Sequence, residues 1–171
     1  MRVIKLALIS IIFFSLLLTV ISLFIPSHIR ILKAINIVAN RDSVMNPIKD
    51  AAKWKSWYPG LDSARLFYDK GQLKGVVLDN KDPEHPATIY ITNEQDDEVT
   101  VQLTARKNSV ESGWKITNYS SGDSVLLQWY MDFHLRWYPW EKFSSLLLEK
   151  SFGSKMEQGL YNLKKLVQYK N

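Results

Sequence analysis

The stretch that decides the fold is residues 139–170, PWEKFSSLLLEKSFGSKMEQGLYNLKKLVQYK. No proline follows Pro139 within it, so the stretch is predicted to be one long helix. Apolar positions and one glycine recur at steps of three and four and form one helix face: Phe152, Met156, Gly159, Leu160, Leu163 and Val167. Such a helix is stable only when something covers its apolar face. Residues 29–137 read mostly as strand, so the expected cover is a sheet.

The residues just before this helix, 124–137, alternate between apolar and polar side chains. The apolar face is Val125, Leu127, Trp129, Met131, Phe133 and Leu135, and the mostly polar face is Gln128, Tyr130, Asp132, His134 and Arg136. A period of two predicts a strand with one buried and one solvated face. The apolar face is therefore expected to lie against the C-terminal helix.

The remaining chain predicts a meander of short strands. The predicted strands are 29–38, 63–68, 72–78, 88–92, 99–105, 114–119 and 124–137. Asp69-Lys70-Gly71 indicates a tight hairpin, and polar residues predict a loop at 79–86 and turns at 93–98 and 120–123. No connection is long enough to require a crossover, so the pairing should be antiparallel. Two short helices are expected after the first strand, at 42–49, capped by Asp42 or Ser43 with Pro47 near the first turn, and at 51–57. The prediction is an α+β domain with seven antiparallel strands and a long C-terminal helix.

An apolar run precedes the domain. Residues 6–25, LALISIIFFSLLLTVISLFI, carry no charge and are long enough to cross a bilayer as a helix. A cleaved signal peptide is the alternative, but Leu23-Phe24-Ile25-Pro26 is a poor cleavage site, which favours an uncleaved anchor. We therefore expect an anchor at 1–26 and a domain at 27–171.

The sequence around the anchor bears on two further questions. Arg2 and Lys5 favour a cytoplasmic N-terminus, whereas Arg30, Lys33 and Arg41 oppose it, and we expect a single-pass cell-membrane protein with an extracytoplasmic domain. Ser15, Thr19 and Ser22 share one helix face, where they could form a helix–helix contact or bond their own backbone.

Composition excludes several classes of site. The 171 residues contain no cysteine, which excludes disulfides, cysteine zinc sites, a thiol nucleophile and an N-terminal lipid-modified cysteine. A net charge of +5 is too small to indicate nucleic-acid binding. No phosphate-loop, Gly-x-Ser-x-Gly or His-Glu-x-x-His motif occurs, and the acidic run Glu94, Asp96, Asp97, Glu98 lacks the spacing of a calcium loop. We expect no metal and no cofactor.

The order of these elements resembles the helix-grip fold of the START-like (SRPBCC) superfamily, which includes polyketide cyclases, dehydrases and lipid-transfer proteins. The resemblance covers about residues 25–167 and is most similar to bacterial members with one N-terminal membrane helix. It is carried by ILKAINIVANRDSVMNPIKD at 31–50, AAKWKSWYPG at 51–60 and FGSKMEQGLYNLKKLV at 152–167. The family commonly has proline at the start of the first helix, where this chain has Arg41-Asp42.

The resemblance implies a cavity for hydrophobic ligands between a curved sheet and the long helix. The residues expected to line it are Trp54, Trp57, Trp129, Met131, Phe133, Leu135, Trp140, Phe143, Leu147 and Phe152. Trp54 and Trp57 could instead pack in the core. The aromatic junction 137–140 could hold a ligand, rest on a membrane interface or close one end of the core.

Three functions remain open on the sequence. Binding of a lipid or another hydrophobic small molecule is favoured by the apolar strand face and the anchor. A cyclase- or dehydrase-like enzyme would need polar groups with shifted pKa values inside the cavity, and the strand face 125–135 offers none. His134 and Asp132 could form a base–acid pair, but their face should point away from the cavity. A structural or partner-binding protein with a filled core is the third reading.

Overall fold

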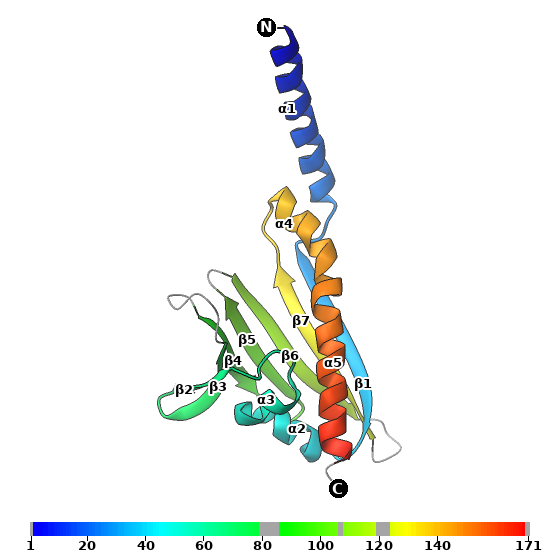
Figure 1. Cartoon of the computed structure of the whole chain (residues 1–171). Helices are drawn as coiled ribbons and strands as arrows, with labels where there is room; N and C mark the ends of the chain where they lie inside the picture. The colour runs from blue at the N-terminus through cyan, green and yellow to red at the C-terminus, as the bar shows by residue number, and fades with distance from the viewer. Residues whose placement is uncertain (1, 79–85, 106–107, 119–123, 170–171) are drawn as a thin grey trace.

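The computed structural model describes residues 2–78, 86–105, 108–118 and 124–169 (Figure 1). The predicted turn at 120–123 and all but the last residue of the predicted loop at 79–86 lie outside these residues. The described strands are β1 (His28–Val38), β2 (Arg65–Asp69), β3 (Gln72–Leu78), β4 (Ala87–Glu94), β5 (Glu98–Ala105), β6 (Asn108–Asn118) and β7 (Ser124–His134). The helices are α1 (Arg2–Leu23), α2 (Arg41–Lys49), α3 (Trp54–Trp57), α4 (Pro139–Ser144) and α5 (Leu148–Gln168), with 3-10 turns η1 (Ala51–Lys53) and η2 (Ser145–Leu147).

The described strands form one curved antiparallel sheet in the order β1-β7-β6-β5-β4-β3-β2. Consecutive strands from β2 to β7 pair with one another, and β1 pairs with β7 at one edge of the sheet. The β2–β3 hairpin turns at Lys70 and Gly71, both of which have positive φ, as a two-residue hairpin requires. The predicted seven-stranded helix-grip fold is confirmed. β7 ends at His134 instead of residue 137, because its partner β1 begins only at His28.

The core lies between this sheet and α5, which runs along β1 and β7 (Figure 1). Met156, Leu160 and Leu163 on the predicted apolar face of α5 are buried, and Phe152 and Val167 are packed at its margin. The predicted single helix is interrupted by η2. Ser144 and Ser145 donate their hydroxyls to the carbonyls of Glu141 and Lys142, at 2.8 and 2.6 Å, and such bonds compete with the regular helix and bend it.

The N-cap of the first short helix lies two or three residues earlier than expected. Asn40 is its N-cap, because its side chain accepts a hydrogen bond from the backbone nitrogen of Ser43 at 2.8 Å, so the expected cap at Asp42 or Ser43 was wrong. Pro47 consequently lies in the last turn instead of the first. The carbonyls that end α2 are satisfied by the indoles of α3: Trp57 donates to Pro47 at 3.1 Å, and Trp54 donates to Ile48 at 2.7 Å.

The apolar run forms α1, which projects from the end of the domain opposite the C-terminus (Figure 1). Among the described residues, Val3–Leu23 is the one helix long and apolar enough to cross a membrane, with a mean hydropathy of 2.7. Thr19 donates its hydroxyl to the Ser15 carbonyl at 2.8 Å and Ser22 to the Thr19 carbonyl at 2.7 Å. These hydroxyls therefore bond their own helix backbone, which was one of the two expected uses.

Candidate functional site

An inner cavity of about 170 Å³ lies between the sheet and α5. Its walls come from the segment after α3, from β3, β4, β5 and β7, and from α5. The lining residues are Tyr58, Pro59, Gly60, Leu61, Leu78, Ile89, Leu103, Trp129, Met131, Phe152, Lys155 and Met156. A partly enclosed, mostly apolar space of this kind favours an apolar group over a charged one.

The position of Trp129 in this wall is fixed on two sides. Its indole nitrogen donates to the hydroxyl of Ser112 at 2.9 Å, and that hydroxyl donates to the Tyr130 carbonyl at 2.8 Å. Its ring meets the ring of Tyr58, with centroids 4.9 Å apart, and lies against Gly159 of α5. These contacts hold the Trp129 ring in one orientation in the wall.

A larger outer cavity of about 510 Å³ adjoins the inner one. It is lined by Leu103, Ala105, Asn108, Ser109, Val110, Phe133, His134, Leu135, Arg136, Glu141, Ser144, Leu148 and Phe152. Leu103 and Phe152 line both cavities and so separate them. The Phe152 ring packs at 5.1 Å on that of Phe133 and is only half-buried. Together the two adjoining spaces have the size usual for small-molecule sites.

Tyr58 is the polar group that the sequence did not place in the cavity. Burial raises the pKa of its phenol well above its ordinary value, so it stays neutral and can exchange hydrogen bonds with a ligand without acting as a base. Among the described lining residues of the inner cavity, the other titratable side chain is Lys155, which is exposed. The inner cavity thus offers a hydrogen-bonding group in an apolar wall.

The outer face of β7 differs from its predicted solvated state. Asp132 is only 4% exposed, because Arg30 of β1 donates to both of its carboxylate oxygens, at 2.8 and 2.5 Å, and His28 lies 3.1 Å away. These contacts, led by the hydrogen bonds from Arg30, lower the pKa of Asp132. The histidine that contacts Asp132 is thus His28, and not His134 as in the predicted pair. The His134 ring stacks on the His28 ring, with centroids 4.7 Å apart. We assign this cluster to the pairing of β1 with β7.

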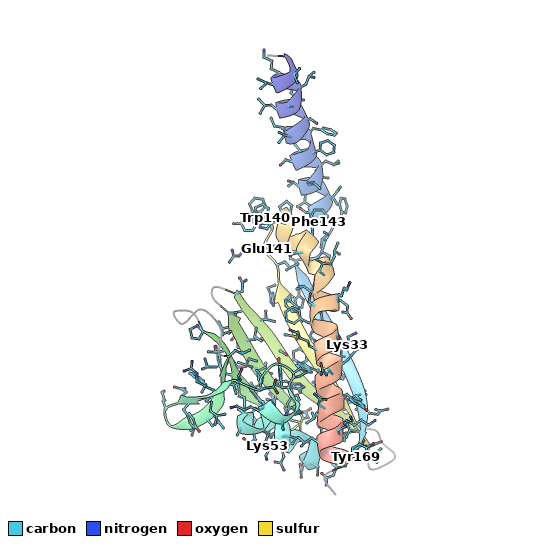
Figure 2. All side chains as sticks on the ribbon, viewed as in Figure 1. Lys33, Lys53, Trp140, Glu141, Phe143 and Tyr169 are labelled. Atoms are coloured by element: carbon cyan, nitrogen blue, oxygen red, sulfur yellow. The ribbon has the colours of Figure 1, made fainter. Side chains whose placement is uncertain are left out.

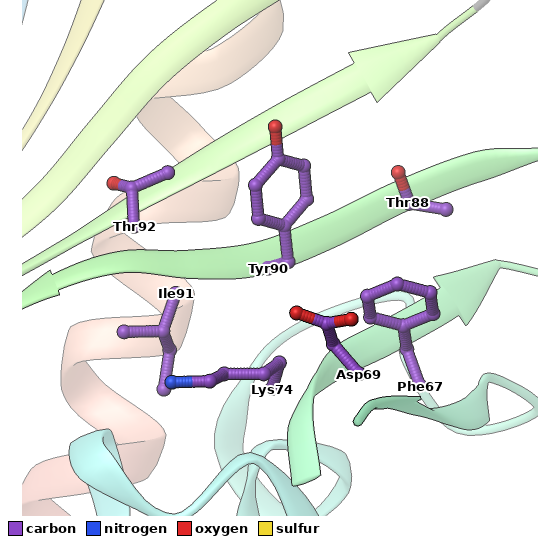
Figure 3. A pocket seen from close by; sticks show the side chains of 7 residues that line it. All are labelled: Phe67, Asp69, Lys74, Thr88, Tyr90, Ile91 and Thr92. Carbon is purple, nitrogen blue, oxygen red and sulfur yellow. The ribbon is translucent and has the colours of Figure 1, made fainter. Parts of the chain in front are cut away.

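A third hollow, of about 450 Å³, lies at the β2–β3–β4 end of the sheet, where Thr88, Tyr90 and Thr92 extend from the same side of β4 (Figure 3). Phe67, Asp69, Lys74 and Ile91 complete its lining. The Phe67 and Tyr90 rings lie 6.4 Å apart. This hollow shares no lining residue with the two cavities beside α5, and it is not the predicted site.

The structure brings together half of the predicted lining residues. Trp129, Met131 and Phe152 line the inner cavity, and Phe133, Leu135 and Phe152 line the outer one. Trp54 and Trp57 are fully buried in the core, where their indoles bind α2.

The other three predicted residues, Trp140, Phe143 and Leu147, belong to α4 and η2, next to the base of α1; Figure 2 shows Trp140 and Phe143 there. Trp140 and Leu147 are exposed and are not among the residues that line either cavity. Leu147 lies in η2, where the predicted helix is interrupted. Phe143 is half-buried in α4.

Sequence reasoning missed Tyr58, Leu103 and Lys155. Leu103 shares the alternation of the buried Val99 and Val101 on β5, which could have placed it inward. Tyr58 lies after a helix end, where no period applies, and Lys155 lies beside the apolar stripe of α5.

Comparison with known proteins agrees with this architecture. Residues 28–168 match a family model described as polyketide cyclase/dehydrase and lipid transport. A START superfamily protein from Mycobacterium smegmatis has a similar structure, with a TM-score of 0.60 and 16% identity over 83% of this chain and 99% of that one. Truncated norcoclaurine synthase from Thalictrum flavum has a TM-score of 0.63 and 11% identity over 84% of this chain and 96% of that one. The di-domain ARO/CYC StfQ from the steffimycin biosynthetic pathway has a TM-score of 0.65 and 11% identity over 83% of this chain and 51% of that one. No curated protein matches the sequence.

At these identities the solved structures establish the fold and leave the chemistry of each protein its own. The family model covers nearly all of the chain after α1, including every strand and α5. The chain therefore belongs to the polyketide cyclase/dehydrase and lipid transport family of the START-like superfamily.

Proposed function

We propose that this protein binds a lipid or another hydrophobic small molecule between the sheet and α5, while α1 tethers it to a membrane. The observation that carries the proposal is the inner cavity, whose lining is apolar apart from Tyr58 and Lys155. The residues proposed to hold the ligand are Trp129, Met131 and Phe152, with Phe133 and Leu135 in the outer cavity. Burial of apolar ligand surface supplies the affinity, and Tyr58 orients a polar end.

The tether follows from the composition of α1. Its apolar side chains are almost all exposed, so water would be an unfavourable surrounding for them and a bilayer a favourable one. A signal sequence passes the same test of length and composition, and detection of α1 in the mature protein decides between the two.

Mass spectrometry of small molecules extracted from the purified full-length protein tests the binding. The protein is held in phosphatidylcholine nanodiscs, and empty nanodiscs give the background. We expect one hydrophobic compound or compound class enriched in the protein sample. No enrichment with a folded protein would contradict the proposal and support the filled-core reading.

Met131→Trp supplies the structural test. Met131 is 2% exposed and lines the inner cavity, so a larger side chain should fill that space and release the ligand. The expected result is a loss of the enriched compound by about tenfold, equivalent to about 1.4 kcal/mol. Gln128→Trp adds an indole on the other face of the same strand and should retain the compound. Thermal melts check that both variants fold.

A further inference from the structure

Four large exposed apolar side chains lie within eleven consecutive residues, outside α1. Trp137 and Trp140 are 68% and 67% exposed, and Leu146 and Leu147 are 67% and 63% exposed. Figure 2 places Trp140 at the base of α1, at the opposite end of the domain from Lys53 and Tyr169. We call these four side chains the junction patch. Apolar side chains gathered in this way mark a surface that contacts something other than water.

Direct contacts hold the junction patch at the end of α1. The Lys142 ammonium of α4 donates to the Ile25 carbonyl and, at 2.8 Å, to the Ser27 hydroxyl. α4 contacts α1, and Ser22 in the last turn of α1 is fully buried. The Tyr138 ring stacks on that of Trp140, with centroids 4.8 Å apart and planes 9° apart. The patch therefore has a defined height relative to the apolar helix.

That height matches the edge of a bilayer. The apolar helix Val3–Leu23 has 21 residues. At about 1.5 Å per residue it spans roughly the 30 Å thickness of a hydrocarbon core. Leu23 then lies at the boundary and α4, which contacts α1, at the level of the headgroups. Tryptophan and tyrosine are enriched at this level because their rings are apolar and their N–H and O–H groups stay hydrated.

We propose that the junction patch rests in the interface of the bilayer that holds α1, and that ligand passes directly between this bilayer and the outer cavity. Arg136 and Leu148, which flank the patch in sequence, and Glu141 and Ser144, which lie between its residues, line the outer cavity. These lining residues bring one wall of that cavity next to the patch. Entry of ligand rests on the proposed binding function, whereas docking of the patch rests only on the tether.

Depth-dependent quenching tests the docking in the full-length chain. Because the chain has no cysteine, a single introduced cysteine carries an environment-sensitive fluorophore at one known position. Trp140→Cys and Leu147→Cys report on the patch, and Lys53→Cys and Tyr169→Cys on the opposite end (Figure 2). Each variant is placed in phosphatidylcholine nanodiscs that contain lipid with a nitroxide near the headgroup.

We expect the nitroxide lipid to quench labels at 140 and 147 several-fold more than labels at 53 and 169, and aqueous iodide to show the reverse order. Equal iodide quenching at all four positions would overturn the docking. Labels at 140 and 147 that are protected from both quenchers, and lose this protection on dilution to one chain per nanodisc, would also overturn it. That result would mean that a second copy of the chain, and not lipid, covers the patch.

Photolabelling tests the entry of ligand. The full-length protein is held in nanodiscs, a diazirine fatty acid is incorporated into the lipid of the same nanodiscs, and labelled peptides from β7 and α5 are measured over time. Trp137→Ser combined with Trp140→Ser should slow labelling several-fold and leave the plateau unchanged. The matched control, Tyr161→Ser with Tyr169→Ser, removes two exposed rings elsewhere and should keep the wild-type rate.

The outcomes separate the two proposals. Equal labelling rates in all three proteins would overturn direct entry, although the quenching result could still support docking. No labelling of cavity peptides in the wild type would overturn the binding function and entry together, and the docking would again be decided by quenching.

Discussion

At the scale of single residues, Asp132 departs furthest from what its position in a strand predicts. Alternation puts it on the outer face, yet the Arg30 guanidinium and the His28 ring bury it there. Asp132→Asn removes the charge that Arg30 pairs with and should lower the free energy of unfolding at pH 7 by about 1 kcal/mol, because Arg30 is half-exposed and partly screened. Tryptophan fluorescence during thermal unfolding in detergent measures this loss.

The same variant tests a pH dependence. Arg30 lowers the pKa of Asp132 in the folded protein, so the stabilisation is present above the ordinary pKa of an aspartate and is lost as pH falls toward the folded value. The difference between wild type and Asp132→Asn should therefore shrink between pH 7 and pH 3. A difference that stayed constant would mean that the charge of Asp132 contributes nothing to the stability.

Residue-scale features were the hardest to predict from the sequence. Asp132 is buried because β1 pairs with β7 in a register that sets Arg30 opposite Asp132, and these residues are distant in sequence. Tyr58 enters the cavity wall because the chain turns after α3, where no period describes side-chain direction. Both depend on long-range contacts, whereas Met131 and Trp129 could be placed from alternation alone.

At the scale of elements, α5 contains two buried glycines with different surroundings. A Cβ added at Gly159 would lie 2.6 Å from the Trp129 ring, which is held in place, and 3.0 Å from Pro59. Gly159→Ala gains up to about 1 kcal/mol of helix propensity but overpacks this contact at a cost of about 1–3 kcal/mol. We expect a lower unfolding temperature than that of the wild type.

Gly153→Ala is the matched control in the same helix. Its Cβ would meet the flexible end of Lys33, with Cε at 3.0 Å, which can move aside. The propensity gain should then dominate, and the variant should be neutral or more stable. If Gly159→Ala were as stable as Gly153→Ala, the close approach of α5 to Trp129 would not exist in solution.

The elements themselves were largely predictable because each carries a local signal. Phe152, Met156 and Leu163 defined the apolar face of α5, and Lys70-Gly71 defined a hairpin. The interruption of the C-terminal helix was not predicted, because it depends on where the hydroxyls of Ser144 and Ser145 bond. Trp140 in α4 and Leu147 in η2 both precede α5 and are exposed at the junction.

At the scale of the whole molecule, the order of elements was enough to predict the topology. Consecutive strands from β2 to β7 pair with one another, and the pairing of β1 with β7 completes the sheet. The size of the cavity was not predictable, because it depends on how Phe152, Leu103 and Tyr58 pack where sheet and helix diverge.

The division between α1 and the domain leads to the last prediction. The core cluster contains no residue of α1, so a chain that begins at Ser27 should fold. It loses the Ile25 carbonyl as an acceptor for Lys142 but keeps the Ser27 hydroxyl. We expect a loss of at most about 1 kcal/mol, or about 4 °C in the unfolding midpoint. Lys142→Met in the full-length chain removes both bonds and should cost at least as much.

The shortened chain should also self-associate through the junction patch, which then has no bilayer to rest in. Sedimentation should show a concentration-dependent dimer that Trp140→Ser weakens. A shortened chain that is unfolded at low concentration would contradict this division, because α1 would then be part of the folding unit and the tether would be inseparable from the domain.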